Sequence, residues 1–162
     1  MISNVSQPST EVFSAFAPEK SLSGFFQVPV GPDGNLTSDG TYTYAWNDEN
    51  RLVEQLKANS EKIEYTYDGI GRMRIKKSYS WTGTAWQLDS ELRFAYDNNC
   101  IIAELDGSDS VIRSYVWGLD IDGGLGTAGG VGGLLLSGNE LAYYDGNGNI
   151  TAMLDTGTGN MA

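Results

Sequence analysis

Five aromatic residues recur along this chain at the ends of segments that alternate as β-strands do. They are Trp46, Tyr67, Tyr96, Trp117 and Tyr144, separated by 21, 29, 21 and 27 residues. Self-similarity at intervals of roughly 20 to 30 residues is the signature of a repeat array. A lone hairpin is marginal in water, so neighbouring hairpins must pair edge to edge. The sequence therefore predicts an all-β fold in which tandem antiparallel hairpins form one extended sheet.

The clearest copy of the repeat runs from Tyr65 to Arg72 and reads strand, turn, strand. Tyr65 and Tyr67 are two residues apart, so they share one face of a strand. Asp68 supplies a carboxylate that can accept backbone N–H groups, and Gly71 tolerates a positive φ. We therefore expect Asp68 to cap a tight turn rather than to act as a chemical acid.

The other copies predict the remaining strands and turns. Strands are expected at 24–30, 41–46, 51–57, 61–67, 73–79, 91–97, 101–105, 111–117, 141–145 and 150–154. The block 49–62 also has helical propensity, but strand is favoured because the next copy follows at once. The Lys and Arg side chains of 73–79 are expected on one solvated face. Asn47 can cap its turn in place of Asp. Gly118 cannot, so the turn after Trp117 should differ.

The composition limits the classes of protein to consider. The chain of 162 residues is 40% hydrophobic, which excludes a wholly disordered protein and predicts one domain with a real core. The first 23 residues are rich in Ser and Pro and show no clean period, so they are expected to form a loose leader. The repeat domain is expected to cover residues 24–160.

The charged and reactive residues argue against several functions. The net charge of −11 disfavours nucleic acid as a partner. The chain has no His and a single Cys, Cys100, expected as a packed thiol at a strand start. Glycoside hydrolysis needs a pair of carboxylates, and no pair in this sequence stands out by its spacing. We expect no enzyme, no cofactor and no metal.

Two glycine-rich motifs have alternative interpretations. Gly124 to Gly129 fits the G-x-G-x-x-G pattern of dinucleotide sites, but the residues that follow are poor helix formers, so a plain loop is favoured. Asp145 to Asn149 resembles the first half of a calcium loop. Ile150 and Thr156 stand where that loop needs Gly and Glu, so a hairpin turn is favoured.

The repeat residues resemble the Rhs/YD-repeat family, which is named for a Tyr-Asp dipeptide in tandem copies. The motif residues are Tyr44, Trp46, Tyr65, Tyr67, Asp68, Gly71, Arg72, Tyr96, Asp97, Tyr115, Trp117, Tyr144, Asp145 and Gly148. The resemblance implies a curled sheet that forms part of a hollow spiral shell, which in full-length bacterial relatives holds a C-terminal toxin. We expect a fragment of such a shell, or a short derivative, without the toxin and its processing segment.

The resemblance also sets the expected location and partners. It implies a protein that is secreted or at the cell surface as part of a larger protein. No signal peptide is visible, and no apolar run reaches the ~18 residues of a membrane span. A toxin domain or a neighbouring repeat segment is the expected partner, and unpaired edge strands predict self-association or partial disorder of residues 1–23 and 156–162.

Exposed aromatic side chains suggest a second function. Trp81, Trp86, Tyr42 and Tyr79 could stack on sugar rings, although aromatic ladders that hold hairpin register are favoured. The principal expectation is a structural shell segment that encapsulates or presents a partner, with no catalysis of its own. The alternative is a cell-surface module that binds carbohydrate or protein.

Overall fold

The computed structural model describes residues 29–161, and these residues form a single antiparallel sheet whose strand order is the order of the sequence. All the regular elements in this part of the chain are strands, which confirms the all-β prediction. The strands are β1 (Thr43–Trp46), β2 (Leu52–Lys57), β3 (Glu61–Tyr67), β4 (Met73–Trp81), β5 (Trp86–Asp97), β6 (Cys100–Asp106), β7 (Val111–Trp117), β8 (Leu134–Ser137), β9 (Glu140–Tyr144) and β10 (Ile150–Asp155).

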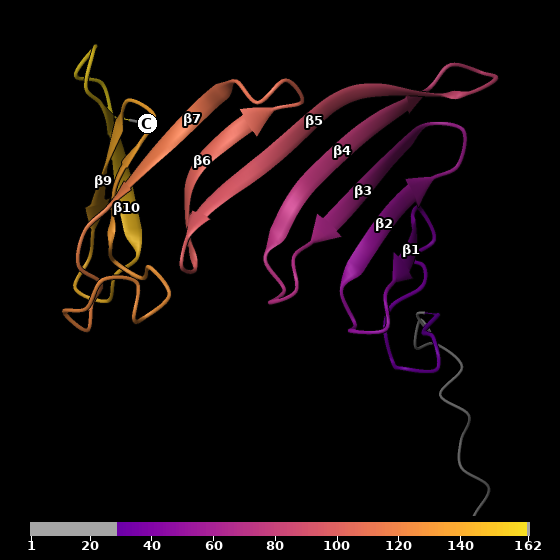
Figure 1. Ribbon diagram of the computed structural model, residues 1–162, viewed down its shortest axis with the longest axis horizontal. Coiled ribbons are helices and arrows are strands. Elements are labelled where there is room, and N and C mark those ends of the chain that lie inside the picture. The colour runs from indigo at the N-terminus through magenta and orange to yellow at the C-terminus, as the bar shows by residue number, and fades with distance from the viewer. Residues whose placement is uncertain (1–28, 162) are drawn as a thin grey trace, which may run out of the picture.

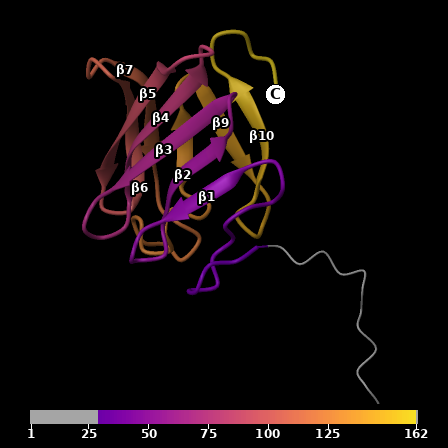
Figure 2. The same ribbon diagram turned by 90° about the vertical axis from the view of Figure 1, so that its right-hand side faces the viewer.

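The sheet is extended and curled. Successive strands follow one another along the long axis from β1 to β10 (Figure 1), and the view down that axis shows the change in strand direction (Figure 2). Neighbouring strands are twisted relative to one another, as in other sheets. Each strand pairs only with its neighbours in sequence, so β1 and β10 are the two ends of the sheet.

The interior is thinner than the sequence suggests. Among the described residues no large side chain is fully buried, and Cys100 is the only hydrophobic residue in the buried class. Large apolar side chains such as Leu119, Leu125 and Val111 are more than half exposed. The prediction of a real core is therefore wrong for this region. The physical reason is that a single sheet layer has no second layer against which to bury a face.

Most local predictions hold. The block 49–62 contains strand β2 and the start of β3 rather than a helix. Most of the predicted strand at 24–30 lies outside the described residues. Within them, Val30 forms an isolated bridge to Leu36. The boundary expected at residue 23 also lies outside them. No helix in the described part of the chain is long and apolar enough to cross a membrane.

The expected single cationic face of 73–79 is wrong. Side chains alternate between the faces of a strand, so Arg74 and Lys76 lie on one face of β4 and Lys77 lies on the other. The register pairs Lys77 with Glu91 across β5, and its ammonium lies 3.3 Å from that carboxylate. Lys77 is therefore held in an ion pair rather than on the surface shared by the other two cations.

Five hairpins share one irregularity, a β-bulge next to the repeat aromatic. In the first, Trp46 pairs with Leu52 while Ala45 pairs with Glu54, so Val53 is left over. The returning strands of the other four hairpins also carry one extra residue beside the aromatic, namely Arg74, Ile102, Leu135 and Thr151. A bulge bends a strand and increases its twist. The recurrence of the bulge therefore favours a curled sheet over a flat one.

Candidate functional site

The repeat aromatics use their polar atoms to reach the preceding hairpin. Each of the five donates one hydrogen bond to a backbone carbonyl, at 2.7 or 2.8 Å. The donor and acceptor pairs are Trp46 Nε1 to Leu36, Tyr67 Oη to Leu52, Tyr96 Oη to Met73, Trp117 Nε1 to Ile101, and Tyr144 Oη to Leu134. Tyr and Trp serve equally because both join a large apolar body to a single donor.

Four of the five acceptor carbonyls occupy the same position in the hairpin before. Leu52 is the residue that pairs with Trp46 at its bulge, and Met73 pairs in the same way with Tyr67. Ile101 pairs with Tyr96 at a bulge, and Leu134 pairs with Trp117 at another. Tyr67, Tyr96, Trp117 and Tyr144 thus each bind the carbonyl at the bulge of the hairpin before, whereas Trp46 binds the Leu36 carbonyl ahead of the first hairpin. We call the five aromatics with these carbonyls the aromatic ladder.

Two arginines add a second contact between neighbouring hairpins. Arg51 lies over the ring of Tyr67 at 5.8 Å and donates a hydrogen bond to the Asp68 carbonyl. Arg72 lies over the ring of Tyr96 at 4.9 Å and donates to the Asn98 carbonyl. Each arginine therefore reaches forward to the next hairpin, whereas each aromatic reaches back. Stacking of this kind is worth about 0.5–1 kcal/mol at partly exposed sites.

The predicted role of Asp68 as a turn cap agrees with the hydrogen bonds. Asp68 Oδ1 accepts the N–H groups of Ile70 and Arg72, and its other oxygen accepts the Arg72 guanidinium at 2.8 Å. Partial burial acts to raise the pKa of this carboxyl, but the Arg72 side chain and the N–H donors together hold it below its usual value. Gly71 takes the positive φ, at 90°.

The same cap recurs at other turns. Asn47, Asp106 and Asp145 each accept the N–H groups two and four residues further on. The fourth residue of each turn has a positive φ, at Asn50, Asp109 and Gly148 respectively. Asn47 therefore substitutes for Asp as predicted. The pKa of Asp145 lies below its usual value because the Asn149 side chain and the backbone N–H groups stabilise the ionised form.

Two motif positions depart from this pattern. Asp97 pairs with Cys100 across a two-residue turn, and its carboxylate accepts only the Asn98 side-chain amide, at 3.3 Å. Gly118 opens the long loop 118–133, where its N–H donates to the Gly133 carbonyl. The turn after Trp117 therefore differs, as the missing side chain of Gly118 predicted.

The remaining motif tyrosines bond locally or pack. Tyr44 Oη donates to Asp39 at 2.9 Å, and Tyr115 Oη donates to Glu104 at 2.6 Å. Burial and the Glu104 carboxylate raise the pKa of Tyr115 to about 12. Tyr65 is half-buried, and burial raises its pKa. None of the three reaches a neighbouring hairpin's bulge in the way that the ladder aromatics do.

The four candidates for sugar stacking do not form one surface. Trp81 and Trp86 pair across β4 and β5, with ring centroids 5.0 Å apart and a 59° tilt. Tyr79 lies on their face, where the Lys62 ammonium covers its ring at 4.4 Å. Tyr42 binds Glu61 on the opposite face of the sheet. Since the tryptophan rings contact each other at an angle, carbohydrate binding stays a prediction without further support.

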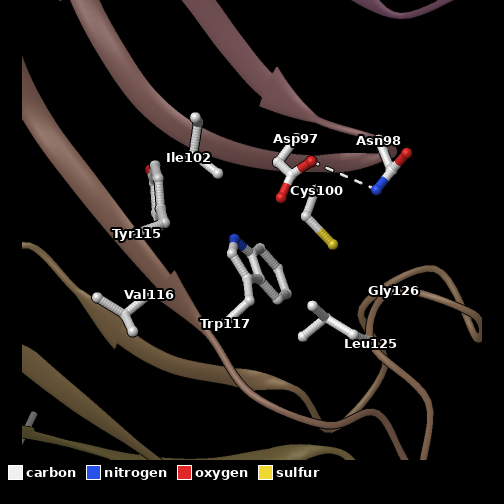
Figure 3. A pocket seen from close by; sticks show the side chains of 9 residues that line it. All are labelled: Asp97, Asn98, Cys100, Ile102, Tyr115, Val116, Trp117, Leu125 and Gly126. Atoms are coloured by element: carbon white, nitrogen blue, oxygen red, sulfur yellow. Dashed lines mark hydrogen bonds between the residues drawn. The ribbon is translucent and has the colours of Figure 1, made fainter.

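A pocket of about 230 Å³ lies where β6, β7 and the loop 118–133 meet. Figure 3 shows the Trp117 ring in it, with Cys100, Leu125 and Tyr115 around the ring. Cys100 begins β6 and is buried, as predicted. Burial, followed by the charges of Asp120 and Asp97, raises the pKa of its thiol. Such a thiol is a weak nucleophile, so the pocket offers packing rather than covalent chemistry.

The two glycine-rich motifs form the structures that were favoured. Residues 118–133 are turns without helix, so no helix N-terminus is available for a dinucleotide phosphate in this loop. Asp145 to Asn149 is a capped hairpin turn between β9 and β10. Among residues 29–161 no three His, Cys, Asp or Glu side chains cluster in a way that could hold a metal ion.

The sequence order of the strands and the repeated contacts between hairpins define a tandem β-hairpin repeat protein. The chain is similar to the tRNA nuclease WapA of Bacillus subtilis strain 168, with 31% identity over 93 residues. It matches equally well the tRNA3(Ser)-specific nuclease WapA of Bacillus spizizenii and the tRNA(Glu)-specific nuclease WapA of Bacillus subtilis subsp. natto. No family model matches the chain.

These matches have a limited extent. They cover 56% of this chain but only 4% of the length of each relative. The chain is therefore homologous to a small part of the WapA nucleases.

Proposed function

We propose that this chain is a structural section of a YD-repeat sheet of the Rhs type. In this role it encapsulates or presents a partner domain and has no catalysis of its own. The observation that carries the proposal is the aromatic ladder, because all five repeat aromatics bond to a backbone carbonyl of the preceding segment, and four of them bond to the bulge of the hairpin before. Side chains engaged in holding register are not free to bind or turn over a substrate.

The thin interior supports the same proposal. Large apolar side chains are exposed on the described sheet, and its two end strands are not paired with each other. Such a sheet gains most when further hairpins or a partner domain cover it. A section of a larger shell would supply that cover.

The similarity to the WapA nucleases fits this role. The 93 matched residues form a small part of each relative, and we propose that the nuclease activity in their names resides outside the matched section. We propose that the partner is a toxin domain or a neighbouring repeat segment. A secreted or cell-surface location belongs to the same proposal.

Protection of the partner domain from protease, measured in the natural protein that carries this segment, tests the proposal. We expect the partner domain to be protected in the wild type and to be cleaved when Tyr67 and Tyr96 are both replaced by Ala. The control is Tyr143→Ala, because Tyr143 is 48% exposed and lies outside the ladder. Equal cleavage of the partner domain in all three proteins would contradict encapsulation.

A second measurement addresses catalysis. The purified chain is expected to leave tRNA and a panel of glycosides and esters unchanged over hours. Turnover that survives repurification and is lost on a single carboxylate substitution would overturn the proposal that the chain has no catalysis of its own.

A further inference from the structure

Strand β10 ends the described sheet (Figure 1), and its edge carries an unused copy of the ladder acceptor. Ile150 pairs with Tyr144 at a bulge, as Leu52 pairs with Trp46. It is therefore the residue whose carbonyl a further repeat aromatic would bind. Every Tyr or Trp side chain of residues 29–161 that donates a hydrogen bond donates it elsewhere. The fifth hairpin thus presents a ladder acceptor without a ladder donor.

The turn between β9 and β10 directs this carbonyl away from β9. The Asn149 carbonyl accepts the Asp145 N–H at 3.0 Å, so it points across its own hairpin. Successive carbonyls of a strand point in opposite directions, so the Ile150 carbonyl faces the outer edge of the sheet. The carbonyls of Arg51 and Arg72 accept across their own turns in the same way, at 3.0 and 2.9 Å, and in both hairpins the next carbonyl accepts the ladder bond.

A bridge beside β10 gives the register that a further strand would take. Leu154 forms an antiparallel bridge to Met161, and the Asp155 N–H donates to the Asn160 carbonyl at 2.9 Å. Asp155 also caps this turn, because its Oδ1 atom accepts the N–H groups two and three residues further on. Residues 155–161 therefore form a turn that returns along the outer edge of β10.

The ladder aromatics lie at a constant register relative to their acceptors. When the pairing of Glu54 with Glu64 is extended along β2 and β3, Leu52 lies opposite Thr66, and Tyr67 is the next residue. The aromatic is likewise one residue beyond the position opposite its acceptor in the three later cases, Tyr96, Trp117 and Tyr144. We call this relation the register rule.

We propose that the outer edge of β10 is the attachment site of a neighbouring repeat segment, whose first strand continues from the turn 155–161 and carries a Tyr or Trp that donates to the Ile150 carbonyl. The Leu154–Met161 bridge and the register rule together place that aromatic at the fifth residue after Met161. An added strand pairs the free backbone groups of an edge, and a matched side chain makes the addition specific. The proposal rests on the proposed function, because it specifies how the repeat sheet is extended.

Extension of the full chain tests the register. The tetrapeptide Glu-Tyr-Thr-Tyr, copied from Glu64–Tyr67, is added after Ala162, so that its final tyrosine is the fifth residue after Met161. Two matched extensions serve as controls. Glu-Tyr-Thr-Phe removes only the donor hydroxyl, and Glu-Tyr-Tyr-Thr keeps the composition but moves the tyrosine by one residue.

The readouts are the Met153 amide and the Ile150 carbonyl. The Asp155 N–H faces the outer edge, so alternation places the Met153 N–H on that edge as well. Exchange at Met153 should be about fivefold slower with the first extension than with either control, the factor expected for one hydrogen bond. The ¹³C resonance of the Ile150 carbonyl should move downfield with the first extension alone, because a carbonyl that accepts a hydrogen bond is deshielded.

Two outcomes would overturn the proposal. One is equal exchange and equal carbonyl resonances in the three extended chains. The other is protection of Met153 in the unextended chain that rises with protein concentration, which would show that a second copy occupies this edge. Encapsulation is judged separately by the protease experiment, which probes the partner domain rather than β10.

Discussion

The hairpins from β1 to β7 and the glycine-rich loop 118–133 connect their strands by different means, yet the aromatic ladder runs through both. The turns between β1 and β7 are short, and three of them are capped by Asn47, Asp68 and Asp106. The loop after Trp117 is long, and its Asp120 does not cap the turn it begins. Even so, Trp117 bonds back to Ile101 before the loop, and Tyr144 bonds back to Leu134 after it. The comparison teaches that the aromatic, rather than the turn, defines a repeat.

Removal of a ladder aromatic is expected to have the largest effect. Trp117→Ala deletes a half-buried indole, its bond to Ile101 and the centre of the pocket, so it should cost about 3 kcal/mol of unfolding free energy. Trp81→Ala is the control, because Trp81 contacts Trp86 beside the turn of its hairpin and lies outside the ladder. That variant should cost about 1 kcal/mol. Urea melts measure both, and equal costs would contradict a special role for the ladder.

The second prediction sharpens the difference between the two regions by changing the loop. Gly130 has a φ of 89°, and a methyl group there would lie 2.7 Å from the Trp117 ring. Gly130→Ala should therefore cost about 3 kcal/mol, from left-handed strain together with the clash. Gly129 has a φ of 70° with open space around it, so Gly129→Ala should cost only about 1 kcal/mol. Thermal or urea unfolding compares the two, and a larger loss at Gly129 would be inconsistent with close packing of Trp117 on the loop.

The third prediction breaks a capped turn. Asp68→Ala removes two bonds to N–H groups and the ion pair with Arg72, so it should cost about 1–2 kcal/mol. Asp97 has the same place after a repeat aromatic but caps no turn. Asp97→Ala should therefore cost less than about 0.5 kcal/mol. Denaturant melts of the pair test this, and a similar loss in both would mean that the cap at Asp68 adds nothing.

The smallest expected effect concerns pH. The pKa values of Asp106 and Asp145 are lower in the folded chain than their usual values, chiefly because the Ser108 and Asn149 side chains and nearby N–H groups stabilise the ionised forms. Folding therefore favours the ionised form of these two carboxyl groups. The resulting stability is present above about pH 3.9 and is lost as the pH falls through the lower folded values.

Asp145→Asn isolates that effect. An Asn caps the equivalent turn at position 47, so the variant should stay within about 1 kcal/mol of the wild type at pH 7. Its stability should fall less steeply than that of the wild type between pH 4 and pH 2. Parallel curves in acid melts would show that the Asp145 charge does not contribute.

Much of the fold could be predicted from the sequence because its signals are local. Alternation at period two identifies the strands, and the residues from Asp68 to Arg72 contain all the groups that close their own turn. The order of strands follows because short turns join only neighbours. The mistaken cationic face at 73–79 was also a local matter, since alternation alone separates Lys76 from Lys77.

The ladder bonds could not be predicted in the same way. Tyr96 reaches a carbonyl 23 residues earlier and Tyr67 one 15 residues earlier, so sequence distance does not reveal the shared rule. The rule depends on which residue lies opposite the previous aromatic at a bulge. The stacking of Arg72 on Tyr96 and the buried carboxylate of Asp120 depend in the same way on non-local packing. Overestimation of the core had another cause, because composition does not reveal whether a sheet has a second layer.

Hydrogen exchange on Tyr96→Phe tests the central claim that the ladder couples one hairpin to the one before it. The substitution keeps the ring and removes only the hydroxyl that donates to Met73, at a cost of about 1 kcal/mol. Tyr143→Phe serves as the control, because Tyr143 is 48% exposed and outside the ladder. The account predicts faster amide exchange in both β3–β4 and β5–β6, with the control unchanged. Faster exchange confined to β5–β6 would contradict it.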